Sequence, residues 1–228
     1  MGLKKNETQD ESIRMTLTAD SLIFDLDGTL WDSTSTCLDA WTSVINENKY
    51  VDISITHSDI KSIAGTQHDL IFSKLFPHLT PRQCKDLTEL CGQQELVFIR
   101  KYGAQLYNNA LEVIDTLSKE YKLFIVSNCQ AGYIETFLSY FKLEMFFIDF
   151  ECSGRTLKSK SDNIKSIIDR NNLKSPIYIG DTQGDSEAAY KNQIPFIYSS
   201  YGFGTVDRYD KKISNLDDLK ELINKKRE

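Results

Sequence analysis

Long apolar runs and a leader-like N-terminus are missing from this chain. The sequence has 228 residues and no stretch of about 18 consecutive apolar residues, which excludes an ordinary transmembrane helix. Residues 1–20 are polar and mixed in charge, without the apolar centre of a signal peptide. We therefore expect a cytoplasmic protein whose residues 1–20 form a loosely ordered tail.

Cysteine and histidine are too sparsely placed to build a disulfide framework or a thiolate–imidazole metal site. Five cysteines occur without close pairing, and an odd number without a secretion signal favours free thiols in a reducing compartment. Cys129, close to a motif described below, is either oxidisable or a small semi-buried thiol, and the second interpretation is favoured. The histidines His57, His68 and His78 lack metal-ligand spacing.

An excess of positive charge is also missing. The formal net charge is −6 and the pI is about 5.2, which argues against nucleic acid or an anionic membrane as a partner. Hydrophobic residues make up 40% of the chain, enough for a sizeable core. The length allows one large domain, or a core with a smaller insert.

Two closely spaced aspartates follow the first apolar run. Leu22 to Phe24 is short and apolar, which predicts a buried strand, and it ends in Asp25-Leu26-Asp27-Gly28-Thr29. Residues i and i+2 of an extended chain point the same way, so Asp25 and Asp27 can face one site. Two carboxyl groups held close together need a cation between them or a shared proton.

The rest of the chain divides into a helical part and an alternating part. Residues 33–107 have helical periodicity and no strand-like run. After residue 108, predicted strands at 123–126, 146–148, 176–179 and 195–198 alternate with helices at 110–119, 133–140, 163–171, 186–192 and 215–225. Alternation of this kind predicts an α/β fold: a Rossmann-like three-layer core with a mostly parallel sheet of five or more strands. The core would comprise residues 21–32 and 108–228, and residues 33–107 would be an inserted helical cap.

Chemically active side chains follow the predicted strands, where open α/β sheets bind ligands. Ser127-Asn128 ends the second strand, Lys158 and Lys160 lie in the loop after the third, and Gly180-Asp181-Thr182-Gln183-Gly184-Asp185 ends the fourth. Each element alone is an ordinary turn, cap or surface loop. Their coincidence at successive strand ends favours a shared site.

This combination resembles the haloacid dehalogenase superfamily, from about Ser21 to the C-terminus. The helical insert and the continuation Leu30-Trp31-Asp32-Ser33 resemble the phosphoglycolate phosphatase and β-phosphoglucomutase branch. An Asp at position 27 is typical of phosphoryl transfer, since carbon–halogen cleavage needs no acid for the leaving group. The resemblance implies a phosphatase for a small phosphorylated metabolite, with a sugar phosphomutase and an inactive binding or regulatory protein as alternatives.

Roles for the individual residues follow from the resemblance and from the needs of phosphoryl transfer. Asp25 would form an aspartyl-phosphate, and Asp27 would protonate the leaving oxygen and then activate water. Asp25, Asp181 and the backbone carbonyl of Asp27 would bind Mg²⁺, with Asp185 in a supporting position. The expected phosphate contacts are Gly28, Thr29, Ser127 and the N–H of Asn128 at a helix start.

Two assignments stay open. The catalytic lysine is Lys160 or Lys158, and the closeness of Lys160 to the helix start favours it. Gly65, Thr66, Gln67 and His68 lie at a break between helices that could contact substrate, although a plain interhelical turn is favoured for any one of them.

Overall fold

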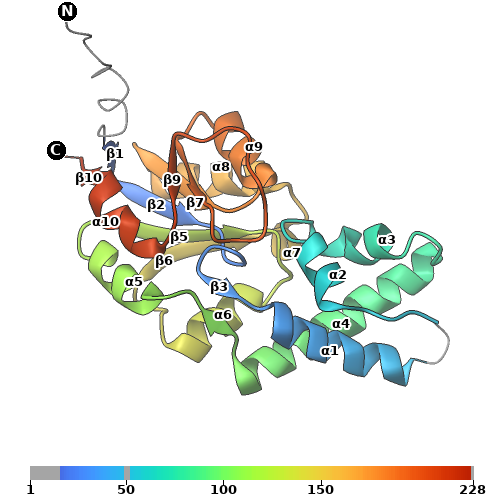
Figure 1. The fold of residues 1–228 in the computed structure, drawn as a ribbon. Helices are drawn as coiled ribbons and strands as arrows, with labels where there is room; N and C mark the ends of the chain where they lie inside the picture. The colour runs from blue at the N-terminus through green and yellow to red at the C-terminus, as the bar shows by residue number, and fades with distance from the viewer. Residues whose placement is uncertain (1–15, 49–51, 227–228) are drawn as a thin grey trace, which may run out of the picture.

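A computed structural model describes residues 16–48 and 52–226, and its centre is a six-stranded parallel sheet (Figure 1). The strand order is β6-β5-β2-β7-β8-β9. The strands are β2 (Ser21–Phe24), β5 (Lys122–Ser127), β6 (Phe147–Cys152), β7 (Pro176–Gly180), β8 (Phe196–Ser199) and β9 (Lys211–Ile213). The prediction of a parallel α/β sheet is confirmed, and the strand before Asp25 lies near its middle.

Helices cover both faces of the sheet because the strands are apolar on both faces. Alternate strand residues such as Phe24 and Ile125 pack against α5 (Ala110–Ser118), α6 (Tyr133–Phe141) and α10 (Leu219–Leu222). Their neighbours, such as Ile23 and Phe124, pack against α8 (Lys160–Asn171) and α9 (Gln183–Lys191) on the other face. This two-residue alternation produces the predicted three layers.

A helical lobe with its own core projects from one end of the sheet (Figure 1). Its helices are α1 (Thr34–Glu47), α2 (His57–Ser62), the 3₁₀ turn η1 (His68–Leu70), α3 (Ile71–Leu75) and α4 (Pro81–Tyr102). Trp41, Phe72 and Leu87 are buried at its centre. The antiparallel pair β3 (Trp31–Asp32) and β4 (Gln105–Leu106) joins the lobe to the sheet. β4 corrects the expectation that residues 33–107 contain no strand.

The two ends of the described chain differ from expectation. The predicted helix over 215–225 is shorter, because η2 (Leu216–Asp218) and α10 give way to strand β10 (Ile223–Lys225). β10 pairs in parallel with β1 (Leu17–Ala19), so this part of the expected N-terminal tail is a strand. The rest of that expectation, residues 1–15, lies outside the described residues. Within the described ranges, none of the helices is both long and apolar enough to cross a membrane.

Candidate active site

Asp25 lies at the carboxyl end of β2, next to the neighbouring strand β7. Its backbone N–H donates to the carbonyl of Ile179 at 2.8 Å, which continues the pairing of β2 with β7 and fixes the position of the side chain. The residue is only 3% exposed, and burial raises the pKa of its carboxyl to about 7, against the lowering effect of Lys160. Its Oδ1 has no hydrogen-bond partner among the described residues.

Lys160, the first residue of α8, holds two carboxylates together. Its Nζ lies 3.1 Å from Asp25 Oδ2 and 2.5 Å from Asp185 Oδ1, and the side chain is buried. Burial opposes the charge, but the two carboxylates outweigh it and raise the pKa of Lys160. The alternative candidate, Lys158, is exposed, and its backbone carbonyl accepts from Gln67 Nε2 at 3.3 Å. The structure therefore brings Lys160, and not the Lys158 side chain, to the aspartates.

Asp181 and Asp185 are placed by the start of α9. Thr182 caps this helix, and Asp185 Oδ2 accepts from Thr182 N at 2.9 Å and from Thr182 Oγ1 at 2.7 Å. Asp181 Oδ2 accepts from the backbone N–H of Phe203 at 2.7 Å, while its Oδ1 has no partner among the described residues. Burial raises the pKa of Asp181, and the nearby Asp185 and Asp25 charges raise it further.

Three carboxylates are close enough to share a cation. One oxygen each of Asp25, Asp181 and Asp185 lie within 4.8 Å of one another. The free oxygens on Asp25 and Asp181 suit a hard divalent cation, which prefers carboxylate ligands. Asp185 already accepts hydrogen bonds on both oxygens, from Lys160 and Thr182, which fits the supporting position expected for it.

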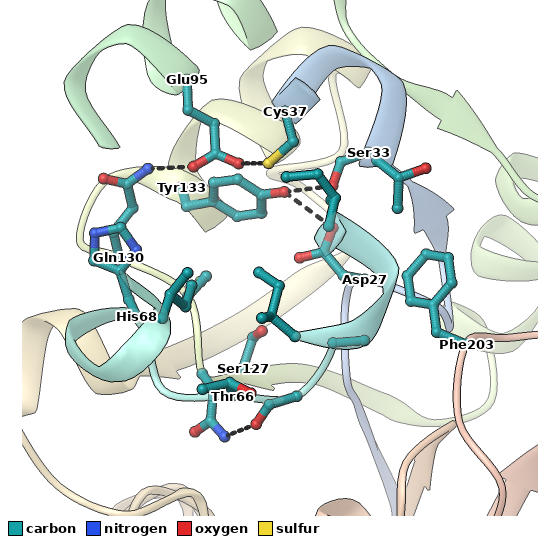
Figure 2. Close-up of a pocket in the computed structure, with 18 of the residues that line it drawn as sticks. Asp27, Ser33, Cys37, Thr66, His68, Glu95, Ser127, Gln130, Tyr133 and Phe203 are labelled. Atoms are coloured by element: carbon teal, nitrogen blue, oxygen red, sulfur yellow. Dashed lines mark hydrogen bonds between the residues drawn. The ribbon is translucent and has the colours of Figure 1, made fainter. Parts of the chain in front are cut away.

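Asp27 forms a hydrogen-bonded triad with Ser33 and Tyr133 (Figure 2). Its Oδ1 accepts from Ser33 Oγ at 2.6 Å and from the Tyr133 hydroxyl at 2.9 Å. Burial raises the pKa of Asp27 to about 6, although both hydrogen bonds lower it. Ser33 directly precedes α1, but its side chain makes no capping bond to that helix and orients Asp27 instead.

The expected phosphate contacts are partly assembled. Gly28 has φ +80°, and a Cβ there would overlap the carboxylate of Asp181. Thr29 Oγ1 is buried without a hydrogen-bond partner in the described chain, and Ser127 is buried at the end of β5. Asn128 is not at a helix start, because α6 begins only at Tyr133. Its side chain instead accepts from Ser153 Oγ at 2.7 Å and donates to the carbonyl of Gly65 at 2.8 Å.

The break between α2 and η1 lies against the sheet end. His68 N–H donates to the carbonyl of Asn128 at 3.2 Å, and Gln67 contacts the backbone of Lys158. Gly65, Thr66 and His68 line a cavity of about 90 Å³ that is also lined by Asp25 and Lys160. Figure 2 shows Thr66 and His68 in this lining. His57 begins α2 and His78 is exposed, and neither is among the described residues that line this cavity.

Several lining residues were not anticipated from the sequence: Ser33 as an orienting group, Tyr133, Glu95, Gln130 and Phe203. Tyr133 reaches Asp27 across 106 positions, and Glu95 comes from α4 in the helical lobe. No local spacing marks such partners. Cys129 is half-buried with a pKa raised by burial, which agrees with the interpretation as an unreactive thiol.

Comparisons with known proteins agree with this architecture. No curated protein sequence matches the chain. The chain is similar in structure to a predicted phosphatase from Clostridium acetobutylicum (22% identity, TM-score 0.72), with 90% of this chain and 96% of that chain covered. It is also similar to a hydrolase of the haloacid dehalogenase-like family from Streptococcus pneumoniae (22% identity, TM-score 0.73), with 90% of this chain and 97% of that chain covered. A third similar structure is that of a predicted phosphoglycolate phosphatase from Haemophilus somnus (18% identity, TM-score 0.76), with 89% of this chain and 97% of that chain covered.

A family model gives the assignment. Residues 22–199 match the model of the haloacid dehalogenase-like hydrolases, a span that begins in β2 and ends with β8. It includes Asp25, Asp27, Lys160, Asp181 and Asp185, the charged residues that the fold gathers at the sheet end. The chain belongs to the haloacid dehalogenase-like hydrolase family.

Proposed function

We propose that the protein is a Mg²⁺-dependent phosphatase that hydrolyses a small phosphorylated metabolite through an aspartyl-phosphate on Asp25. The proposal is carried by the position and hydrogen bonding of the Asp25 carboxylate. Asp25 lines the cavity with one oxygen held by Lys160 and the other without a hydrogen-bond partner in the described chain. A nucleophile in phosphoryl transfer needs such a fixed orientation together with a free oxygen.

The remaining residues supply the other requirements of the reaction. Asp27, with a pKa of about 6, is suited to give a proton to the leaving oxygen and later to take one from water. Tyr133 and Ser33 hold its carboxyl in one orientation. Lys160, Thr29 and Ser127 would offset the negative charge on the transferred group. Bound at Asp25, Asp181 and the Asp27 carbonyl, Mg²⁺ would supply further charge neutralisation.

The helical lobe would act as a cap over this chemistry. We propose residues 33–107 as the cap and residues 21–32 and 108–228 as the catalytic core. Support comes from the hydrogen bonds of Gly65 and His68 to Asn128, which hold the lobe against the sheet end. Such a cap excludes water and selects the leaving group.

Phosphate release is the direct test. Purified protein with Mg²⁺ should release inorganic phosphate from at least one member of a panel that includes p-nitrophenyl phosphate, small alkyl phosphates and sugar phosphates. Chelation of the metal should abolish the release, and added Mg²⁺ should restore it. Absence of release from every ester, or full activity in the presence of chelator, would contradict the proposal. Phosphate isomerisation without net release would instead identify a phosphomutase.

Asp25→Asn tests the nucleophile. The variant should lose turnover by at least about a thousandfold, because an amide does not form the phosphoenzyme, while its circular dichroism spectrum stays unchanged. The wild type should bind beryllium fluoride, a mimic of the aspartyl-phosphate, and the variant should not. Retained activity would remove Asp25 from this role.

A further inference from the structure

In the described part of the chain, the cap side of the cavity offers no lysine or arginine to receive an anionic substrate. Among the described residues that line it, Lys160 is the one lysine or arginine, and its charge is taken up by Asp25 and Asp185. His68 also lines the cavity, but burial lowers the pKa of its imidazole, so it is neutral near pH 7. The groups that would meet the non-phosphate end of a substrate are therefore uncharged or acidic.

Glu95 is the acidic group on this side. It comes from α4, is 4% exposed and accepts hydrogen bonds from the Cys37 thiol and, at 2.9 Å, from Gln130 Nε2 (Figure 2). No ion pair to Glu95 is present in the described part of the chain. Burial raises the pKa of its carboxyl to about 8, and the charge of Asp27 adds to the effect. Near pH 7 the free carboxyl is therefore mostly protonated, and the ammonium of a bound ligand would lower its pKa and favour the ionised form.

Aromatic groups complete the surroundings of Glu95. Trp41 and Tyr133 both line the cavity. Trp41 is 1% exposed, and its indole N–H faces the Glu95 carboxyl and lowers the pKa of that group. Ring faces attract cations, so these aromatic groups suit a cationic ligand group beside Glu95. The cavity volume of about 90 Å³ suits a small leaving group.

Resting on the phosphatase activity proposed above, we propose that the leaving group is a small amino alcohol, whose ammonium lies beside Glu95 while its phosphate lies at Asp25. A phosphate ester brings further negative charge into a site that already contains several carboxyl groups. A carboxylate on the leaving group would add to this repulsion, whereas an ammonium offsets it and, beside Glu95, favours the ionised form of that carboxyl. Phosphoglycolate is therefore a poor fit, although a structural neighbour is a predicted phosphoglycolate phosphatase.

Three phosphate esters of similar length test which charge on the leaving group the full-length protein prefers in the presence of Mg²⁺. They are 2-aminoethyl phosphate, 2-hydroxyethyl phosphate and phosphoglycolate, which end in an ammonium, a hydroxyl and a carboxylate. The kcat/KM should fall in that order, with about tenfold or more between the first and the last. A flat profile, or a preference for phosphoglycolate, would overturn the inference while leaving the phosphatase activity intact. No release from these esters or from p-nitrophenyl phosphate would overturn both proposals.

Glu95→Gln tests the assignment of the ammonium to this residue. The variant keeps the size of the side chain and removes its charge, so the preference for 2-aminoethyl over 2-hydroxyethyl phosphate should shrink towards unity through a higher KM for the amine. The ratio of kcat/KM for the two esters is the measurement, because it cancels any effect of the substitution that is common to both substrates. Glu89→Gln is the matched control, because Glu89 lies on the same helix with an exposed side chain near Lys85 and should keep the wild-type ratio. An unchanged ratio in Glu95→Gln would overturn the assignment.

Discussion

Lys160 determines the charge balance of the site because its ammonium lies between two buried carboxylates. Asp25 and Asp185 each lie within salt-bridge distance of its Nζ. Removing the cation of a buried ion pair leaves uncompensated charge and costs about 3–5 kcal/mol in general. The sequence left Lys158 and Lys160 as alternatives because both lie in the loop before α8. Only the three-dimensional placement separates an exposed side chain from a buried one.

Lys160→Met should therefore reduce both activity and stability. We expect phosphate release to fall at least about a hundredfold, because the charge on the transferred group loses its cation. The midpoint of thermal unfolding should also fall for the metal-free protein, since two carboxylates are left facing each other. Lys158→Met, the neighbouring exposed lysine, should match the wild type in both measurements. The opposite pattern would reassign the catalytic lysine.

Asp27→Asn should depend on the leaving group. With an alkyl phosphate, whose alkoxide needs a proton, kcat should fall by about 10²–10⁴-fold. With p-nitrophenyl phosphate, whose phenolate leaves without a proton, the loss in formation of the phosphoenzyme should be much smaller. Single-turnover phosphate transfer to Asp25 measures this step separately from hydrolysis. Equal losses for both esters would contradict the role of Asp27 as an acid.

At the scale of elements, the turn after β2 brings the backbone close to Asp181. Gly28 has positive φ, and the space that a Cβ would need is filled by the Asp181 carboxylate. This close approach explains why a glycine follows the aspartate pair. The sequence indicated a turn at Gly28, but the residue that crowds it lies on a strand end far along the chain.

Gly28→Ala should consequently lower stability by about 1–3 kcal/mol and displace Asp181, with loss of affinity for Mg²⁺. Chemical unfolding and a Mg²⁺ titration of activity measure the two effects. Gly184→Ala is the control, because the nearest atom to its Cβ would be Thr182 Oγ1 at 3.7 Å and alanine favours a helix. The control variant should be as stable as the wild type or more so.

Elements with their own periodicity could be predicted from the sequence, and elements that depend on a distant partner could not. The central strands and the helices α6, α8 and α9 are apolar or amphipathic in their own right, so their positions were predicted to within a few residues. β1 and β10 have three residues each and exist through pairing with one another across the chain. The same limit applies to the site: Asp25 and Asp181 follow strands directly, whereas the Tyr133–Asp27 bond depends on tertiary structure.

On the scale of the whole molecule, buried acids link stability to pH. The pKa values of Asp25, Asp27 and Glu95 rise to about 7, 6 and 8, from ordinary values of 3.8, 3.8 and 4.5. Over this range the folded protein binds more protons than the unfolded chain. The free energy of unfolding therefore decreases as pH rises from about 4 towards 8.

The metal-free protein should accordingly melt at a lower temperature at about pH 8 than at about pH 5.5. Mg²⁺ binds ionised carboxylates, so it should raise the melting temperature more at the higher pH. Glu95→Gln should flatten the upper part of the metal-free profile and raise the melting temperature near pH 8, because the amide has no proton to lose. A metal-free melting temperature that rises between these pH values would contradict the buried-acid account.

The antiparallel pair β3 and β4 connects the helical lobe to the core at one place. Asp32 and Gln105 lie opposite one another in antiparallel register, so the helical lobe leaves the core and returns to it at adjacent points. A chain that passed from one to the other through a two-residue turn would form an ordinary β-hairpin. The lobe is thus attached like a module at a single hairpin site, where another unit could be exchanged for it without rerouting the sheet.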